Sequence, residues 1–456
     1  MKFDAIVIGA GQAGGPLSNR LAEKGWSVAL VERAQLGGTC INTGCTPTKT
    51  MLASAQVAHY ARHASRWGVS AGDVTVDLPA VVARKNEIVE TFRQNQERGV
   101  AAHESLRLYR GHGRFRDAHT VDVAGQELTS EKIFIDTGTC HVLPPVEGLE
   151  RTPYLTNASI MELDTVPEHL LVLGSGYIGL EFAQMFARFG SRVTIVNRSK
   201  QILKREDPEV AAELQKILEA EGLRFVMEAQ AKRAERSGGV TTLTVDTPQG
   251  RQTISGSHLL VATGRIPNTD DLGLAAAGVE TDPAGFIRVN GRLETTAPGI
   301  WAMGDVKGGP QFTHISYNDY QIVWANLMEG KNLTIENRYL PYAVFTDPQL
   351  GGLGMTEKEA RAKGFRLKIG TIPMSRVARA IERDETAGMM KIVVDASNDR
   401  ILGASILATE GGEIVQLLGV AMMAGAPYTL LKGAVYTHPT LAEGLWSLME
   451  SVKPVD

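Results

Sequence analysis

Cys40 and Cys45 are the residues with the clearest chemical potential in this sequence. They lie in the segment Gly37-Gly38-Thr39-Cys40-Ile41-Asn42-Thr43-Gly44-Cys45, and the chain of 456 residues has only 3 cysteines. Two thiols at this spacing can cycle between a dithiol and a disulfide, and thereby accept or release an electron pair. A zinc site would need further ligands, and no second cysteine pair is present. We therefore expect a redox-active pair, with a buried pair of unreactive thiols as the alternative. A helix beginning near Cys45 would favour its thiolate.

A glycine-rich turn precedes the cysteines and has the pattern of a dinucleotide-binding loop. The elements expected around it are a strand, a helix and a strand, at Phe3–Ile8, about Gly14–Lys24 and Val28–Glu32. Gly9 would allow the tight turn, Gly11 the approach of a pyrophosphate, and Gly14 the close packing of helix on strand. Glu32 follows Gly9 by 23 residues and can accept hydrogen bonds from ribose hydroxyls. The pattern predicts a bound dinucleotide; an ordinary turn is the alternative.

The same pattern occurs a second time in the chain. A strand at His169–Leu173, a helix at Leu180–Phe189 and a strand at Arg192–Val196 surround the loop residues Gly174, Gly176, Tyr177, Ile178 and Gly179. The last strand is followed by Asn197 and Arg198, with Lys200 and Lys204 nearby, where NAD-binding proteins carry an acid. Cations at this place suit a 2′-phosphate, so the sequence favours NADPH over NADH. A solvated basic loop is the alternative.

The alternation of strands and helices predicts an α/β protein with two Rossmann-like dinucleotide-binding domains. We expect the first domain over residues 1–150, completed by about 273–337, and the second over 151–272. Residues 338–456 have a different pattern and predict a C-terminal α+β domain. Its expected elements are strands at Val344–Phe345, Lys368–Pro373, Met389–Val394 and Ile401–Leu407, and helices at about Gly412–Met423 and Leu441–Met449.

Composition limits the partners. The chain is 43% hydrophobic and 21% charged with a net charge of −4, and it has no basic stripe, so we expect no nucleic-acid partner. No apolar run reaches the ~18 residues that span a bilayer, so we expect no membrane association. The N-terminus lacks the features of a signal peptide. Together with the few cysteines, this predicts a cytoplasmic protein.

Several segments of this chain resemble those of the class I pyridine nucleotide–disulfide oxidoreductases, the family of glutathione reductase, lipoamide dehydrogenase and mercuric reductase. The resemblance covers essentially the whole chain. Besides the cysteine segment, it rests on Asp136-Thr137-Gly138, Ala262-Thr263-Gly264-Arg265-Ile266-Pro267-Asn268, Ala302-Met303-Gly304-Asp305 and His438-Pro439-Thr440-Leu441-Ala442-Glu443. It implies FAD in the first domain, NAD(P)H in the second, and a homodimer joined through the C-terminal domain.

The resemblance also implies a role for each matching residue. Cys40 would be the thiol that meets the acceptor, and Cys45 the thiol beside the flavin. Lys49 would pair with Glu181 near the flavin, and Tyr177 would cover the face where the nicotinamide docks. The remaining cofactor contacts would come from Gly38, Thr39, Gly113, Thr137, Gly138, Gly304, Asp305, Gly264 and Arg265.

His438 and Glu443 resemble the acid–base pair that the partner subunit supplies in this family. Glu443 would orient the imidazole, which could deprotonate Cys40 and protonate a leaving thiolate. No resident metal is expected: His59 and His63 have helical spacing, but no third ligand is evident. We expect Cys140 to be a small structural residue, and Met422 and Met423 to be core residues.

The sequence leaves two classes of electron acceptor open, a small disulfide and a thiophilic metal ion. Arg198-Ser199, Arg205-Glu206-Asp207-Pro208 and Asp384-Glu385-Thr386-Ala387-Gly388 look closest to mercuric reductases and to copper-reducing flavoproteins of reactive-chlorine resistance. Residues 451–456, however, lack the terminal cysteine pair that delivers Hg(II) to the active site of mercuric reductases, which argues against Hg(II). The chain also has His438, where mercuric reductases usually carry no histidine, and this residue favours a small disulfide over a metal ion. Two further hypotheses are quinone reduction or transhydrogenation without the thiols, and a redox-sensing flavoprotein.

Overall fold

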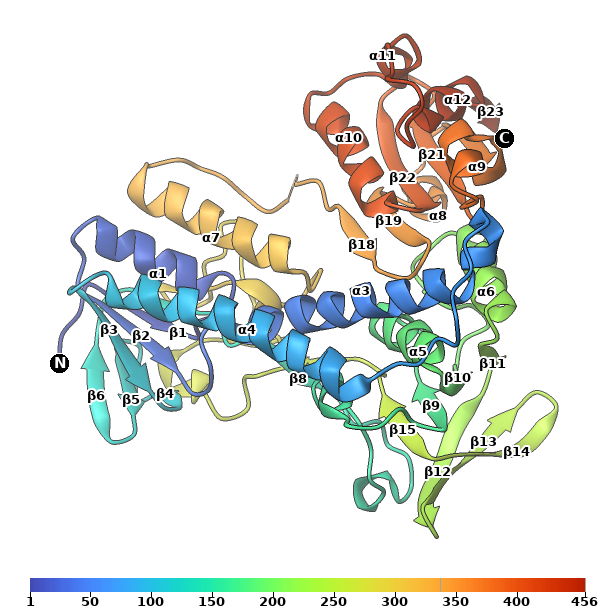
Figure 1. The fold of residues 1–456 in the computed structure, drawn as a ribbon. Helices are drawn as coiled ribbons and strands as arrows, with labels where there is room; N and C mark the ends of the chain where they lie inside the picture. The colour runs from blue at the N-terminus through green and yellow to red at the C-terminus, as the bar shows by residue number, and fades with distance from the viewer. Residues whose placement is uncertain (337, 456) are drawn as a thin grey trace. The chain divides into compact units, whose positions relative to one another are not determined.

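A computed structural model describes residues 1–336 and 338–455 (Figure 1). The chain divides into two compact units, which are described separately. The first unit contains Met1–Thr50, Ala80–Val142 and Gly264–Arg338, and the second contains Met51–Pro79, Leu143–Thr263 and Tyr339–Asp456.

The first unit is built on a five-stranded parallel sheet in the order β17-β7-β1-β2-β3. Its strands are β1 (Ala5–Ile8), β2 (Val28–Glu32), β3 (Leu106–Arg110), β7 (Ile133–Ile135) and β17 (Ile300–Ala302). β1, β2, β7 and β17 are short, mainly apolar runs because both faces of the sheet are covered, whereas the edge strand β3 carries Arg107 and Arg110. β17 comes from the late segment of the unit and pairs in parallel with β7.

Alternate residues of these strands enter two different cores. Ala5 and Val7 pack with Leu17 and Leu21 of α1 (Gly14–Glu23) and with residues of α7 (Thr313–Met328). Ile6 and Ile8 point to the other face, which the three-stranded sheet of β4, β5 and β6 covers. The further elements are α2 (Gly38–Asn42), β4 (Gly113–Phe115), β5 (Thr120–Val123), β6 (Gln126–Thr129), β8 (Thr139–His141) and β16 (Arg265–Pro267). The helices α3 (Cys45–Arg62) and α4 (Leu78–Ala101) belong to this unit only in part, because Met51–Pro79 belong to the second unit.

The second unit holds the second dinucleotide fold, a parallel sheet in the order β11-β10-β9-β15. A three-stranded antiparallel sheet, β12-β13-β14, packs on this sheet through Leu243 and Val245. The elements are β9 (His169–Leu173), α5 (Tyr177–Phe189), β10 (Arg192–Val196), α6 (Pro208–Ala220), β11 (Arg224–Val226), β12 (Gln230–Ser237), β13 (Val240–Thr247), β14 (Gly250–Gly256) and β15 (His258–Val261).

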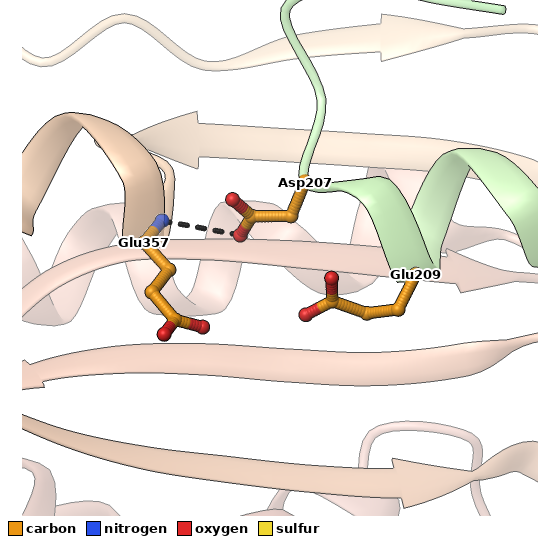
Figure 2. Close-up of side chains that lie close together, drawn as sticks. All are labelled: Asp207, Glu209 and Glu357. Atoms are coloured by element: carbon orange, nitrogen blue, oxygen red, sulfur yellow. Dashed lines mark hydrogen bonds between the residues drawn. The ribbon is translucent and has the colours of Figure 1, made fainter. Parts of the chain in front are cut away.

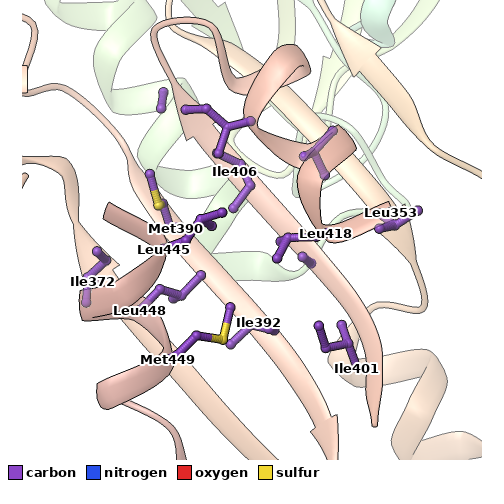
Figure 3. Packing of buried hydrophobic residues seen from close by; sticks show 14 of the residues in the cluster. Leu353, Ile372, Met390, Ile392, Ile401, Ile406, Leu418, Leu445, Leu448 and Met449 are labelled. Atoms are coloured by element: carbon purple, nitrogen blue, oxygen red, sulfur yellow. The ribbon is translucent and has the colours of Figure 1, made fainter. Parts of the chain in front are cut away.

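The C-terminal part of the second unit is an antiparallel sheet in the order β18-β19-β22-β21-β20-β23. Figure 3 shows its core, in which Met390 and Ile392 of the sheet meet Leu418 of α10 and Leu445 and Leu448 of α12. The elements are β18 (Tyr342–Val344), β19 (Gln349–Gly354), α8 (Glu357–Ala362), β20 (Leu367–Pro373), α9 (Ala378–Glu382), β21 (Met389–Asp395), β22 (Ile401–Ala408), α10 (Gly411–Met423), α11 (Tyr428–Lys432), α12 (Gly444–Glu450) and β23 (Lys453–Val455).

The structure departs from the sequence prediction at a few elements. β19 was not expected, because its sequence Gln-Leu-Gly-Gly-Leu-Gly lacks β-formers. Its glycines serve packing: a Cβ on Gly351 would lie 2.2 Å from the Gly411 carbonyl oxygen, and one on Gly352 would lie 2.0 Å from the Tyr342 ring. Met422 is buried as expected, but Met423 is 67% exposed, so its assignment to the core was wrong.

Candidate active site

The first glycine loop has the geometry of a phosphate cradle. Gly9 has φ +103°, and a Cβ there would lie 2.2 Å from the Asp136 carbonyl oxygen. A Cβ on Gly14 would lie 2.1 Å from the Gly9 carbonyl oxygen, so helix α1 can approach β1 this closely only with glycine. Side chains at Gly9 and Gly14 would clash with the backbone that forms this turn, so the two glycines give the loop the tight form that a dinucleotide-binding loop requires.

Asp136 holds the start of α1 in place, a role that the sequence motif Asp136-Thr137-Gly138 did not indicate. Its Oδ2 accepts hydrogen bonds from the backbone N–H of Gly14 at 2.8 Å and of Ala13 at 3.2 Å. Burial raises the pKa of Asp136 to about 8, against the lowering effect of these two N–H groups. Glu32 lies at the end of β2 and accepts backbone N–H groups from Ala10 at 2.9 Å and from Ala34 at 2.8 Å.

Asp305 and Arg265, both predicted cofactor residues, meet through Thr139. The Thr139 hydroxyl donates to Asp305 Oδ2 at 3.1 Å and accepts from Arg265 Nε at 2.7 Å. Burial raises the pKa of Asp305, while the nearby Arg265 charge opposes the shift. Thr137 and Gly138 hold the same region by exchanging hydrogen bonds with Asn268.

Gly113 lies in β4, where a Cβ would stand 3.2 Å from side-chain atoms of Ile8 and Val31. In this position it permits close packing beneath the end of β1. Gly264 has φ +143° just before β16, and Cys140 is a half-buried residue of β8.

The two cysteines lie next to each other, Cys40 within α2 and Cys45 at the start of α3. Cys40 is in the short helix α2, and Cys45 is the first residue of α3, followed one turn later by Lys49. The pKa of Cys40 is raised, first by its hydrogen bond with the Cys45 sulfur and then by burial. Cys45 is the exposed residue of the pair, and Cys40 is half-buried.

Thr313, the first residue of α7, is a site residue that the sequence did not reveal. Its Oγ1 lies 3.3 Å from the Cys45 Sγ, and its hydrogen bond to Cys40 lowers the pKa of that thiol. Thr313 is far from the cysteines in sequence and belongs to no recognised motif, so only the fold reveals the contact.

The second glycine loop repeats the geometry of the first. Gly174 has φ +110°, and a Cβ there would lie 2.5 Å from the Ala262 carbonyl oxygen. A Cβ on Gly179 would lie 2.3 Å from the Gly174 carbonyl oxygen. Gly176 precedes α5, and Tyr177 and Ile178 are its first residues. Glu181 is buried in the same helix and accepts the backbone N–H of Phe345 at 2.9 Å.

Asn197 and Arg198 have different environments at the end of β10. Asn197 is buried, and its Nδ2 donates to the carbonyl oxygens of Ser199 at 2.9 Å and Gln201 at 3.1 Å. Its side chain therefore shapes the loop from inside. Arg198, Lys200 and Lys204 are exposed and give this loop a positive surface.

His438 and Glu443 form the predicted pair within the second unit. His438 Nδ1 lies 2.9 Å from Glu443 Oε2 and 3.1 Å from Oε1, and the imidazole is 65% exposed. The pairing with a carboxylate fixes the ring and leaves it accessible. Cys40 and Lys49 belong to the first unit, and His438 and Glu181 to the second. Any pairing across the units stays a prediction.

Asp207, Glu209 and Glu357 form an acidic cluster in the second unit, with oxygens within 4.8 Å of one another (Figure 2). The Lys391 ammonium lies 2.8 Å from Asp207 and 2.7 Å from Glu357, and it also pairs with Glu209. The lysine thus supplies the positive charge that the cluster requires.

The rings of His59 and His63 lie 4.3 Å apart between centroids at a tilt of 39°, and His63 Nδ1 contacts the His59 carbonyl oxygen at 2.8 Å. Burial lowers the pKa of His59 to about 4. Among the described residues, no helix is both long and apolar enough to cross a membrane.

Comparison with known proteins agrees with this geometry. The family model for "Pyridine nucleotide-disulphide oxidoreductase" matches residues 3–319, and the model for the dimerisation domain of the same family matches residues 340–449. The chain therefore belongs to this family. It is a flavoprotein disulfide oxidoreductase that uses a pyridine nucleotide, and the predicted fold and enzyme class are confirmed.

Two similar proteins, one of which also has a solved structure, illustrate this relationship. The probable pyridine nucleotide-disulfide oxidoreductase RclA of Escherichia coli (strain K12) is 38% identical over 460 residues, which cover 99% of this chain and 100% of the relative. A mercuric reductase of Lysinibacillus sphaericus is 35% identical over 443 residues, covering 97% and 81%. The solved Cu(II) complex of HOCl-induced flavoprotein disulfide reductase RclA from Escherichia coli has a TM-score of 0.90, with 37% identity and 99% coverage of both chains.

Proposed function

We propose that the protein binds FAD and NADPH and delivers electron pairs through Cys40 and Cys45 to a thiophilic metal ion. The observation that carries this proposal is the adjacency of the two sulfurs at the start of α3, in the unit that holds the first dinucleotide cradle. When bound, FAD would accept hydride from the nicotinamide and pass the electron pair to the disulfide. Copper and mercury are proposed as acceptors because the similar proteins carry them in their names.

Different residues of the chain would bind the cofactor and pass electrons to the acceptor. Gly9, Gly11, Gly14 and Glu32 would hold the adenosine diphosphate part of FAD, and Asp305 its ribityl chain. Cys40 would meet the acceptor, while Cys45 would face the flavin. Reduction of one metal ion by two electrons, or of two ions by one each, would return the dithiol to the disulfide and balance the electrons.

NADPH is proposed as the donor because the loop after β10 exposes four cations, Arg198, Lys200, Lys204 and Arg205. Arg198→Ala should lower kcat/KM for NADPH about 10- to 100-fold, since it removes a charge-assisted phosphate contact, and should leave NADH unchanged. Lys216→Ala is the matched control, because that lysine is an exposed cation of α6 outside the loop. An equal loss with both nucleotides would contradict the assignment.

A small disulfide is a second candidate acceptor, and the His438–Glu443 pair favours it. A disulfide leaves a thiolate that must be protonated, which an oriented imidazole can do, whereas a metal ion needs no such proton. We also propose a homodimer joined through the C-terminal domain, which would let this pair act on the partner's thiols. The few cysteines support a reducing compartment such as the cytoplasm.

The test is anaerobic NADPH oxidation by the FAD-loaded protein with Cu(II), Hg(II), glutathione disulfide and a quinone as parallel acceptors. Turnover with a metal or the disulfide should disappear in Cys40→Ser. Turnover confined to the quinone and unchanged in this variant would instead make the thiols dispensable. Negligible turnover with every acceptor would point to a redox sensor.

A further inference from the structure

Asp319 lies beneath the turn that carries Asp305, and its side chain is completely buried. Its Oδ2 accepts the backbone N–H of Gly304 at 2.8 Å and pairs with Lys307 Nζ at 3.2 Å. Its Oδ1 accepts from Arg338 Nη1 at 2.6 Å. All of these residues belong to the first unit. A carboxylate thus connects helix α7 to both ends of the short 3-10 turn, Gly304–Lys307.

The turn has a conformation that needs such support. Gly304 has φ +69°, and a Cβ there would lie 2.5 Å from Asp136 Oδ1. Gly304 directly precedes Asp305, so the orientation of the Gly304 backbone, which its N–H contact fixes, helps to set where the Asp305 side chain points. A buried N–H that loses its acceptor costs free energy, and the turn would rotate to recover one.

The charges around Asp319 also help to keep the Asp305 carboxylate in position. Lys307 and Arg338 have side chains that are 3% and 13% exposed, so Asp319 compensates two nearly buried cations. Without it, both cations would seek another anion, and the carboxylate of Asp305 is near Lys307, whose charge already acts on it. Asp319 therefore keeps Lys307 from competing for the Asp305 carboxylate.

We propose that Asp319 is a positioning residue for the flavin, which acts by fixing the Gly304–Asp305 turn so that the Asp305 carboxylate is free to hold the ribityl chain. The inference rests on the proposed function, because it takes Asp305 as a flavin ligand. Asp319 itself is buried within the protein and would not touch the cofactor.

The experiment compares Asp319→Ala with Arg338→Met, which removes one ion pair of Asp319 but leaves the Gly304 contact. FAD release on dilution of the holoprotein is followed by flavin fluorescence, and the bound flavin by visible circular dichroism. Asp319→Ala should raise the FAD dissociation constant about 10- to 100-fold and change the dichroism spectrum. Arg338→Met should change the dissociation constant less than 3-fold, even where it lowers thermal stability. Equal effects of the two variants on FAD would overturn the proposal.

A double-mutant cycle with Asp305→Ala separates this proposal from the assignment of the flavin site. If Asp319 acts through Asp305, the effect of Asp319→Ala on FAD affinity should largely vanish in the Asp305→Ala background. Additive effects would refute the positioning role alone. If Asp305→Ala by itself leaves FAD affinity unchanged, the flavin assignment of that residue fails. Asp319→Asn, which keeps the side-chain volume, serves as the replacement where the alanine variant does not fold.

Discussion

Replacing Lys391 by methionine tests the acidic cluster of the second unit. Lys391 is 2% exposed and Asp207 is 3% exposed, so their ion pair at 2.8 Å is shielded from water. Removing one partner of such a pair typically costs about 3–5 kcal/mol, because the other charge stays buried without compensation. Methionine retains the apolar length of the side chain, so the loss would be almost entirely electrostatic.

The other two carboxylates change this magnitude little. Glu209 and Glu357 are 47% and 25% exposed, and each can return to water at a cost of roughly 0–1 kcal/mol. Asp207 also keeps backbone N–H contacts from Glu357 at 3.1 Å and Lys358 at 3.4 Å. We therefore expect Lys391→Met to lower the free energy of unfolding by about 4 kcal/mol, which corresponds to a fall in Tm on the order of 10 °C.

Thermal unfolding of the holoprotein, followed by far-UV circular dichroism, measures this effect. Lys368→Met is the matched control, since Lys368 pairs with Asp399 at 2.6 Å in the same sheet but is 24% exposed. The control should cost less than about 1 kcal/mol. A Lys391 variant no less stable than the control would refute the claim that the cluster depends on its lysine.

Three further predictions concern titration and turnover. Burial raises the pKa of Glu206 to about 7, and this carboxyl group accepts a hydrogen bond from Tyr342. The folded protein therefore favours the protonated carboxyl group, and its contribution to the free energy of unfolding is present at low pH and is lost as pH rises through 7. Denaturant unfolding should therefore show Glu206→Gln gaining about 2 kcal/mol over the wild type between pH 5 and 8.5, and a constant difference would contradict this. Thr313→Val should raise the pKa of Cys40 further, so that alkylation of this thiol requires a higher pH than in the wild type; an unchanged pH profile of alkylation would exclude the hydroxyl. His438→Gln should lower turnover with a small disulfide about 100-fold and leave turnover with Cu(II) unchanged, and equal losses would argue against a proton-transfer role.

The sequence predicted those parts of the fold that depend on local patterns. β2, β9 and β10 have the predicted bounds, because short apolar runs between glycine-rich turns define buried parallel strands. Both glycine loops also have the expected positive φ at Gly9 and Gly174. β19 could not be predicted, since its glycines are explained only by the carbonyl group and the aromatic ring that they meet in the folded sheet.

The site was predictable where a motif carries its residues, and less so elsewhere. The cysteine pair and the His438–Glu443 pair lie within single segments, so spacing alone brings their members together. Thr313 and Asp319 are different, because they act through contacts with residues distant in sequence. A threonine or aspartate in a helix carries no local signal of such a role, and only the packing of α7 reveals it.

An anaerobic reductive titration of the FAD-loaded protein tests the central claim most directly. If electrons pass from the flavin to Cys40 and Cys45, each wild-type subunit should take up two electron pairs, whereas Cys40→Ser should take up only one. Uptake of a single pair by both proteins would contradict the account, because the thiols would then lie outside the path of the electrons.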